Sequence, residues 1–123
     1  MKVIIDTNFI LSCLKKKVQI FEEIDNLNLD AVVPEQVVNE LKKLKENKKK
    51  SYADRELCNL ALQLIKHKKI KKIKLSKVYV DSGILDYVKK NKYVCIATLD
   101  RELKRRLVGV RFVIIRKRKL EIE

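Results

Sequence analysis

Four acidic residues that lie far apart in this sequence could perform chemistry together. They are Asp6, Glu40, Asp81 and Asp100. Carboxylates that lie close together repel one another, so a cluster of them needs a proton, a cationic partner or a metal ion. The rest of the chain is strongly basic, with 30 Lys and Arg residues against 16 Asp and Glu residues and a formal net charge of +14. An acidic cluster in a basic protein indicates metal-dependent chemistry on a polyanion.

The pattern of apolar residues predicts alternating strands and helices. Short apolar runs predict strands at 3–5, 31–33, 73–75, 94–97 and 111–115, with a further edge strand in the tail, 116–123. Apolar residues at helical spacing predict helices at 8–14, 18–27, 35–46, 52–67, 81–90 and 100–107. This alternation is typical of an α/β fold with a mostly parallel sheet and helices on both faces. Because there is neither a linker nor a repeat, we expect a single domain over residues 1–123.

Three of the acids fall at one edge of such a sheet. Asp6 directly follows the first predicted strand, and Asp100 comes three residues after the strand at 94–97. Asp81 begins a predicted helix, and helices that follow parallel strands begin at the same edge. Since ligands of open parallel sheets bind outside the carboxyl ends of the strands, we expect these carboxylates to meet there.

Glu40 lies on the predicted helix at 35–46, at the border of its apolar stripe. That stripe consists of Val37, Val38, Leu41 and Leu44. From the border, a carboxylate can point sideways into a cleft. Each acid also has an ordinary alternative role, because Asp commonly caps the start of a helix and Glu40 could be a solvated charge. The four are considered together because they follow one ordered pattern along the chain.

The net positive charge bears on partners rather than on the fold. A phosphate backbone is the first candidate partner and an anionic membrane surface is the second. High Lys, Ile and Glu usage is also typical of thermophilic proteins, so part of the positive charge has an explanation other than a nucleic-acid partner. No apolar run approaches the roughly 20 residues of a membrane-spanning helix, and the N-terminal apolar stretch is too short for a signal peptide. We therefore expect a cytoplasmic protein.

Other kinds of chemistry fit the sequence poorly. The three cysteines, Cys13, Cys58 and Cys95, are widely spaced among apolar residues, which predicts reduced core residues rather than disulfides or a zinc site. Only two glycines are present, so a Gly-rich phosphate loop is excluded. A haloacid-dehalogenase-like phosphatase needs a second Asp where this chain has Asn8. A receiver-like domain needs an Asp at the end of its third strand, which is absent here.

Four short motifs surround the acids: VIIDTN at 3–8, VPEQVVNEL at 33–41, DSGIL at 81–85 and ATLDREL at 97–103. In this order they resemble the motifs of the PIN-domain family of metal-dependent ribonucleases, and the match covers nearly the whole chain. The resemblance implies a three-layer α/β/α sandwich, Mg²⁺ or Mn²⁺ at the four acids, and cleavage of RNA phosphodiester bonds. The family includes VapC-type toxins and nucleases that process ribosomal RNA.

The resemblance also implies roles for the individual acids. Asp6 and Asp100 would be direct ligands of the metal, and the other two acids would contact it directly or through water. One departure from the family pattern concerns the third motif. Many members carry a second acid directly after the first one, where this chain has Ser82. Asp86, one helical turn further on, is a candidate to compensate and is equally a candidate surface residue.

RNA would be held by residues near the acids. Asn8 and Thr98 could orient water or a ligand, or could cap a helix and a turn. The basic side chains beside the fourth motif would contact phosphates; they are Arg101, Lys104 and Arg105. We expect the four tyrosines to pack rather than to stack on bases. Further partners that the resemblance leaves open are an antitoxin, a ribosome-assembly partner and a second copy of the chain. The alternative function is a PIN-like RNA-binding or assembly module without nuclease turnover.

Overall fold

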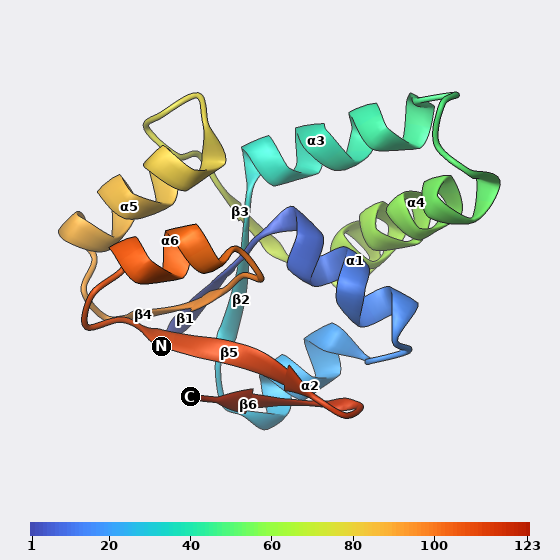
Figure 1. Ribbon diagram of the computed structural model, residues 1–123. Coiled ribbons are helices and arrows are strands. Elements are labelled where there is room, and N and C mark those ends of the chain that lie inside the picture. The colour runs from blue at the N-terminus through green and yellow to red at the C-terminus, as the bar shows by residue number, and fades with distance from the viewer.

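The computed structural model describes residues 1–123 and contains one six-stranded sheet with helices on both sides (Figure 1). The strands are β1 (Lys2–Ile5), β2 (Asp30–Pro34), β3 (Lys71–Ile73), β4 (Val94–Ala97), β5 (Arg111–Arg116) and β6 (Lys119–Ile122). The helices are α1 (Thr7–Lys15), α2 (Ile20–Asn26), α3 (Glu35–Glu46), α4 (Tyr52–His67), α5 (Val80–Lys90) and α6 (Arg101–Arg106). Every predicted element is present, and the bounds of α3, α4 and β4 are as predicted.

The strand order of the sheet is β3-β2-β1-β4-β5-β6. All neighbouring strands run parallel except β5 and β6, which pair antiparallel as a hairpin at the edge. The predicted mostly parallel sheet is therefore confirmed. In the pairing of β1 with β4, Ile5 lies opposite Ala97. The two strands thus end side by side, directly before the first and fourth motif acids.

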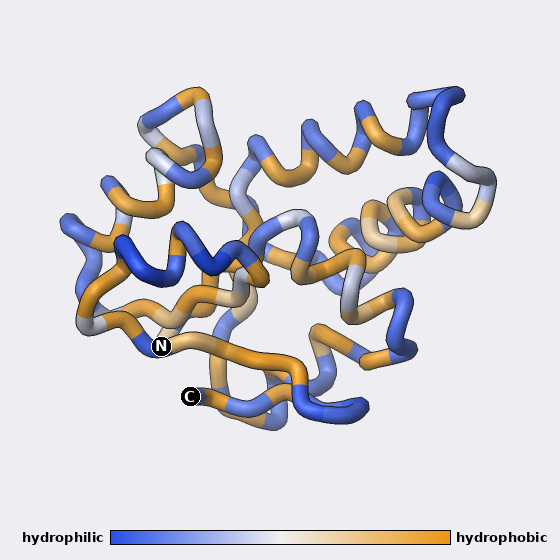
Figure 2. The backbone as a smooth tube through the Cα atoms, viewed as in Figure 1, coloured by the Kyte–Doolittle hydropathy of each residue, from blue (hydrophilic) through white to orange (hydrophobic).

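The side chains of the central strand point alternately to two hydrophobic cores, as the pleat of a strand requires. Val3 and Ile5 join the larger core, to which α1, α2, α3 and α4 contribute. Ile4 points the other way, into a smaller core that it shares with α5 and α6. A strand buried on both faces is typical of the middle of a parallel sheet covered by helices. Figure 2 shows β5 largely in orange and α6 largely in blue, in line with an apolar sheet and a polar outer helix.

Local signals begin the helices that frame the sheet edge. Pro34 ends β2 and directly precedes α3, where its missing amide hydrogen leaves no helical hydrogen bond unmade. Ser51 caps α4, because its Oγ accepts a hydrogen bond from the backbone N of Asp54 at 3.1 Å. Gly109 adopts a φ of 77° in the turn after α6, a conformation that glycine adopts at little cost.

The strand predicted at 73–75 is wrong in its bounds. β3 spans Lys71–Ile73 instead, and Ile73 pairs with Pro34 at the end of β2. After Ile73 the chain turns inward, and Leu75 is buried in the smaller core. The apolar alternation at Ile73 and Leu75 therefore comes from an edge strand followed by an anchored loop, and not from one continuous strand.

The environments of the cysteines and tyrosines were predicted with different success. The three cysteines are buried and free, as expected for reduced core residues. The prediction that the tyrosines pack is wrong for three of them, since the exposed fractions are 77% for Tyr52, 78% for Tyr79 and 70% for Tyr93.

No helix combines the length and the apolar character needed to cross a membrane.

Candidate active site

The carboxyl ends of β1 and β4 bring Asp6 into contact with Thr98. The backbone N of Asp6 donates to the carbonyl O of Ala97 at 3.0 Å, which extends the strand pairing to the first acid. Thr98 Oγ1 donates to Asp6 Oδ2 at 3.0 Å, and the backbone N of Thr7 donates to Asp6 Oδ1 at 2.8 Å. Burial raises the pKa of Asp6; these two hydrogen bonds oppose the rise, and the charge of Asp100 adds to it.

Asp100 caps α6 at the same edge of the sheet. Its Oδ1 accepts hydrogen bonds from the backbone N of Glu102 at 2.9 Å and of Leu103 at 3.1 Å. Its own backbone N donates to Thr98 Oγ1 at 3.1 Å. The helix-capping role is therefore observed for Asp100, as it is for Asp6 at the start of α1. In Asp100, capping occupies one carboxylate oxygen and leaves the other available to a ligand.

Glu40 of α3 and Asp81 of α5 complete an electrostatic group. Burial raises the pKa of Glu40, and the charges of Asp6 and Asp81 raise it further. Burial also raises the pKa of Asp81; the charges of Asp100 and Asp6 add to this rise, and Arg106 lowers it. Each of these carboxyl groups therefore interacts with at least one other, although they come from separate elements. We refer to the four acids as the acidic group.

The acidic group does not form a closed ligand set in this arrangement. No three His, Cys, Asp or Glu side chains lie where they could hold a metal ion together. Asp6 and Asp100 are half-buried and held by hydrogen bonds, whereas Glu40 and Asp81 are exposed. The two exposed side chains can therefore rotate toward the two that are fixed. The alternative role of Asp81 as a helix cap is wrong, because α5 begins at Val80, one residue earlier.

One buried hydroxyl beside the acidic group lacks a partner. Thr7 is 2% exposed, and its Oγ1 makes no hydrogen bond. The proximity of this hydroxyl lowers the pKa of Glu40, so the two groups are neighbours. Leaving a buried polar group unpaired costs about 1–3 kcal/mol. Glu40 is the neighbouring acceptor that would supply the missing partner once its exposed side chain turns toward Thr7.

The loop between β3 and α5 is held from two sides, and this fixes the position of the first turn of α5, which carries Asp81. Gln36 Nε2, on α3, donates to the carbonyl O of Leu75 at 3.1 Å and of Lys77 at 3.0 Å. From the other side Leu75 packs against Gly83, where an added Cβ would lie 2.7 Å from Leu75 Cβ. The absence of a side chain at Gly83 therefore allows the loop to lie directly on α5.

Asp86 does not replace the acid that the third motif lacks. Its Oδ2 accepts a hydrogen bond from Ser76 Oγ at 2.5 Å and lies 3.3 Å from Lys90 Nζ. These contacts with Ser76 and Lys90 lower the pKa of Asp86, the opposite of the shift in the acidic group. Asp86 therefore anchors the loop before α5 and is not part of the acidic group.

Comparison with known proteins agrees with this architecture. A family model described as a PIN like domain matches residues 3–119. The chain belongs to the PIN-domain family. Ribonuclease VapC4 of Methanocaldococcus jannaschii is 31% identical over 123 residues, which cover 96% of this chain and 92% of that protein. The solved structure of the PIN domain endonuclease Utp24 has a TM-score of 0.80 and 28% identity, and the match covers 99% of this chain and 90% of that one.

A second solved structure shares the fold at lower similarity. It is a domain of a functionally unknown protein from Methanocaldococcus jannaschii, with a TM-score of 0.58 and 18% identity over 99% of this chain and 96% of that one. The PIN-domain family and the α/β/α sandwich that the motifs implied are therefore confirmed. The roles assigned to individual residues stay predictions.

The basic side chains of α6 in this PIN domain differ in their freedom to bind a polyanion. Arg101 is exposed and forms no ion pair. Lys104 Nζ lies 5.4 Å from the centre of the Phe112 ring, a cation–π contact. Arg105 is paired with Glu102, one turn earlier on the helix. Of the three predicted phosphate-binding residues, Arg101 is therefore the one with its whole charge available.

Sequence reasoning missed several residues that shape this site. Gly83 was used only to exclude a phosphate loop, although a glycine inside a helical pattern is a signal of close packing. Gln36 gives no such signal, because its hydrogen bonds join segments 39 and 41 residues apart. Arg106, which lowers the pKa of Asp81, gives no such signal either, because its position near Asp81 depends on how α6 lies beside α5. Thr7 belongs to the first motif, but nothing in the sequence indicates that its side chain is buried next to Glu40.

Proposed function

We propose that this PIN domain is a ribonuclease that hydrolyses RNA phosphodiester bonds in a metal-dependent reaction at the acidic group. The observation that carries this proposal is that Thr98 joins Asp6 and Asp100 at the ends of β1 and β4, while Glu40 and Asp81 lie near enough to shift in pKa with Asp6. Groups perturbed in this way by burial and by each other are typical of functional sites. The relatives described as a ribonuclease and as an endonuclease support the same class of reaction.

The chemistry of the donors fits Mg²⁺ or Mn²⁺. These hard ions prefer oxygen ligands and keep several waters, and every candidate ligand here is a carboxylate. Asp6 and Asp100 would bind the ion directly, and Glu40 and Asp81 would rotate to bind it directly or through water. The hydroxyl of Thr7, which neighbours Glu40, would help to orient that carboxylate toward the ion. When bound, the ion would polarise a phosphoryl oxygen and lower the pKa of the attacking water.

The residues of the chain itself would orient and hold the substrate. Thr98 keeps Asp6 in one orientation through its hydrogen bond at 3.0 Å. Asn8 is exposed in the first turn of α1, where its amide can donate to a phosphate oxygen or orient the attacking water. Arg101, Lys104 and Arg105 supply positive charge next to Asp100, which offsets the repulsion between the acidic group and an incoming phosphate.

The decisive experiment measures cleavage of a single-stranded RNA with Mg²⁺ or Mn²⁺ by the wild type, Asp6→Asn and Asp100→Asn. We expect each substitution to lower the rate by at least about 100-fold, while circular dichroism shows an unchanged fold. Asp25→Asn is the matched control, since it removes an exposed acid on α2 that is not part of the acidic group and has no ion pair. Cleavage that persists in excess chelator, or in both acidic-group variants, would rule out this proposal.

The second candidate is a PIN-like module that binds RNA or assembles with other proteins without turnover. The open arrangement of the acids is the observation that favours it. This candidate predicts RNA binding that weakens steeply with salt and no cleavage with any divalent ion. The antitoxin, the ribosome-assembly partner and the homodimer remain predictions, which co-purification and light scattering would test.

A further inference from the structure

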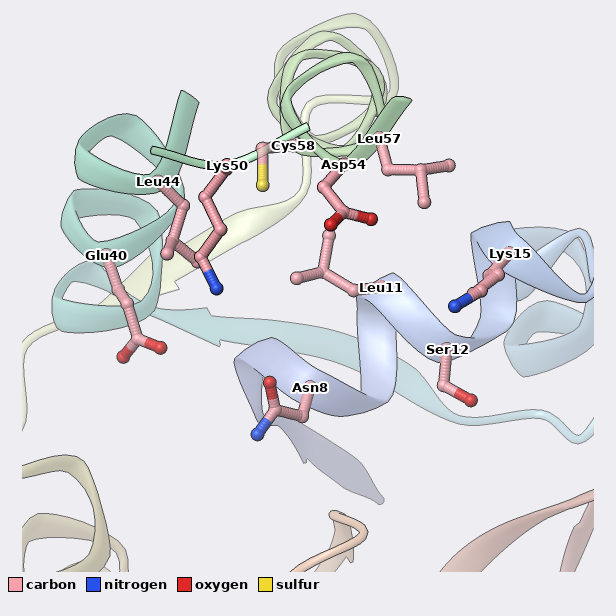
Figure 3. Close-up of a pocket in the computed structure, with 10 residues that line it drawn as sticks. All are labelled: Asn8, Leu11, Ser12, Lys15, Glu40, Leu44, Lys50, Asp54, Leu57 and Cys58. Carbon is pink, nitrogen blue, oxygen red and sulfur yellow. The ribbon is translucent and has the colours of Figure 1, made fainter. Parts of the chain in front are cut away.

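A cavity of about 340 Å³ opens between α1, α3 and α4 and reaches the acidic group at one end (Figure 3). Glu40 and Asn8 line that end. The rest of its wall is half apolar, formed by Leu11, Leu44, Leu57 and Cys58, and half polar or charged. Its volume lies at the low end of the roughly 300–1,000 Å³ that is typical of ligand pockets. The cavity therefore continues the candidate active site into the groove between the helices.

Three charged side chains without ion-pair partners also line this cavity. They are Lys15 on α1, Lys50 in the loop before α4, and Asp54 in the first turn of α4. Figure 3 shows Lys50, from the loop before α4, and Asp54, from α4, reaching into the space between α3 and α1. Both lie near the thiol of Cys58 at the back of the cavity, since burial raises the pKa of this thiol most, Asp54 raises it further and Lys50 lowers it. These charges thus face the interior of the cavity.

The wall that carries Lys50 and Asp54 is held in place by hydrogen bonds. Ser51 Oγ accepts from the backbone N of Asp54 at 3.1 Å, which fixes the first turn of α4. The backbone N of Lys50 donates to the carbonyl O of Asn47 at 3.0 Å. Arg55 Nε, on α4, donates to the carbonyl O of Lys45 on α3 at 2.9 Å. The cavity is therefore formed before any ligand binds, and binding need not order this wall.

We propose that this cavity binds one nucleotide of the RNA strand, adjacent to the phosphate that lies at the acidic group. This inference rests on the proposed ribonuclease function. The apolar wall would cover the face of the base, and Lys15 and Lys50 would contact the phosphates on either side of that nucleotide. RNA is favoured over a protein segment because the cavity opens at Glu40, beside the phosphate of the proposed reaction, and because the two free lysines match a phosphate backbone.

Asp54 adds a preference among bases. A carboxylate only accepts hydrogen bonds, so it selects a base edge that presents N–H donors. Guanine presents two adjacent donors, N1–H and N2–H, on its Watson–Crick edge, which match the two oxygens of a carboxylate. Inosine lacks the second of these donors and is otherwise the same shape. The subsite should therefore favour guanosine over inosine, and this difference should depend on Asp54.

The test compares Lys15→Met/Lys50→Met with Lys16→Met/Lys49→Met. The control pair removes the same charge from neighbouring exposed positions that do not line the cavity. Binding of a fluorescent single-stranded RNA would be measured at several salt concentrations on the Asp100→Asn background, so that the result does not depend on cleavage. The salt dependence is the slope of the logarithm of the binding constant against the logarithm of the salt concentration. We expect the first pair to reduce the steepness of this slope by about 1.4, since each phosphate of a single strand that a lysine neutralises contributes roughly 0.7. The control pair should change it much less.

Each outcome decides the inference. A weakening confined to the Lys15 and Lys50 variant, together with a guanosine-to-inosine preference that Asp54→Asn removes, supports the nucleotide subsite. Equal effects of the two lysine pairs would overturn it and leave the groove to a protein partner, while cleavage by the wild type would still uphold the ribonuclease. If the wild type neither binds nor cleaves RNA, the proposed function fails and the subsite fails with it.

Discussion

Thr98 links two acids through a single hydroxyl: its Oγ1 donates to Asp6 Oδ2 at 3.0 Å and accepts from the backbone N of Asp100 at 3.1 Å. Thr98 is fully buried, at 0% exposure, so water does not replace either hydrogen bond. The two strands that end beside it, β1 and β4, are paired up to Ile5 and Ala97. The distance between the first and fourth motif acids is therefore set by the sheet and adjusted by this one side chain.

Replacing Thr98 with Val should impair the site more than the fold. The hydrogen bond from Thr98 lowers the pKa of Asp6, so its removal should raise that pKa further and move the acidic limb of the pH–rate profile to higher pH. The buried backbone N of Asp100 would also be left without its acceptor, at a cost of about 1–3 kcal/mol of unfolding free energy. Rates across pH and urea denaturation would measure both effects. Thr98→Ser should restore the profile, and an unshifted limb in Thr98→Val would contradict the assigned role.

Replacing Asp6 with Asn should stabilise the metal-free protein at neutral pH. The pKa of Asp6 is raised in the folded state, so its contribution to stability is full below the unfolded pKa of about 3.9 and is lost as pH rises through the folded pKa. Asn can still cap α1 and accept from Thr98. Thermal unfolding in chelator should therefore give a higher Tm for Asp6→Asn at pH 7 and a vanishing difference below pH 4.

Asp86→Asn provides a control of opposite sign. The hydrogen bond from Ser76, followed by that from Lys90, lowers the pKa of Asp86. Its contribution to stability is therefore present above the unfolded pKa and is lost as pH falls through the folded pKa. This variant should melt at a lower temperature than the wild type at pH 7, and the difference should shrink on acidification. If both variants shifted the Tm in the same direction at pH 7, the electrostatic account of the acidic group would be wrong.

Much of the fold follows from local sequence. The helices at 35–46 and 52–67 carry strong periodicity and clear starts at Pro34 and Ser51, which is why their bounds were predicted correctly. The error at 73–75 arose because Leu75 is apolar for a tertiary reason. It fills the space left by the missing side chain of Gly83, and that packing is invisible to any local period.

The candidate site divides in the same way. Asp6 and Asp100 could be placed from topology, because each follows a strand that ends at one edge. For Glu40, the sequence predicted a position at the border of the apolar stripe of α3, but not that its carboxylate lies near the other acids. The neighbours that act through space could not be inferred, since Arg106 and Gln36 reach the site only after whole elements pack. The exposed tyrosines were misjudged because aromatic residues pack more often than not.

Gly83→Ala should destabilise the protein although it improves helix propensity. Ala in place of Gly favours a helix interior by about 1 kcal/mol. The added Cβ would, however, lie 2.7 Å from Leu75 Cβ, an atom that cannot move without its backbone. Overpacking of this kind typically costs about 1–3 kcal/mol, so we expect a net destabilisation of roughly 1 kcal/mol, with slower cleavage because α5 carries Asp81. Urea denaturation would measure the stability.

Ser82→Ala is the matched control for Gly83→Ala. It makes the neighbouring position on the same helix an alanine, but that position is exposed. We expect its unfolding free energy and cleavage rate to stay close to those of the wild type. If Gly83→Ala were as stable as Ser82→Ala and equally active, the loop at Leu75 would not be what holds Asp81 in place.

Arg101→Ala should weaken RNA binding more than Arg105→Ala. Arg101 is exposed without an ion-pair partner, whereas Arg105 is already paired with Glu102. RNA must compete with that pair for Arg105, and the pair is an exposed one worth no more than about 1 kcal/mol. In chelator, the salt dependence of binding should fall by roughly 0.7 for Arg101→Ala and by less for Arg105→Ala. Equal decreases in this salt dependence would contradict the prediction and mean that Glu102 releases Arg105 when RNA binds. In that case Arg105→Ala would weaken RNA binding by the same amount with Glu102→Gln as without it.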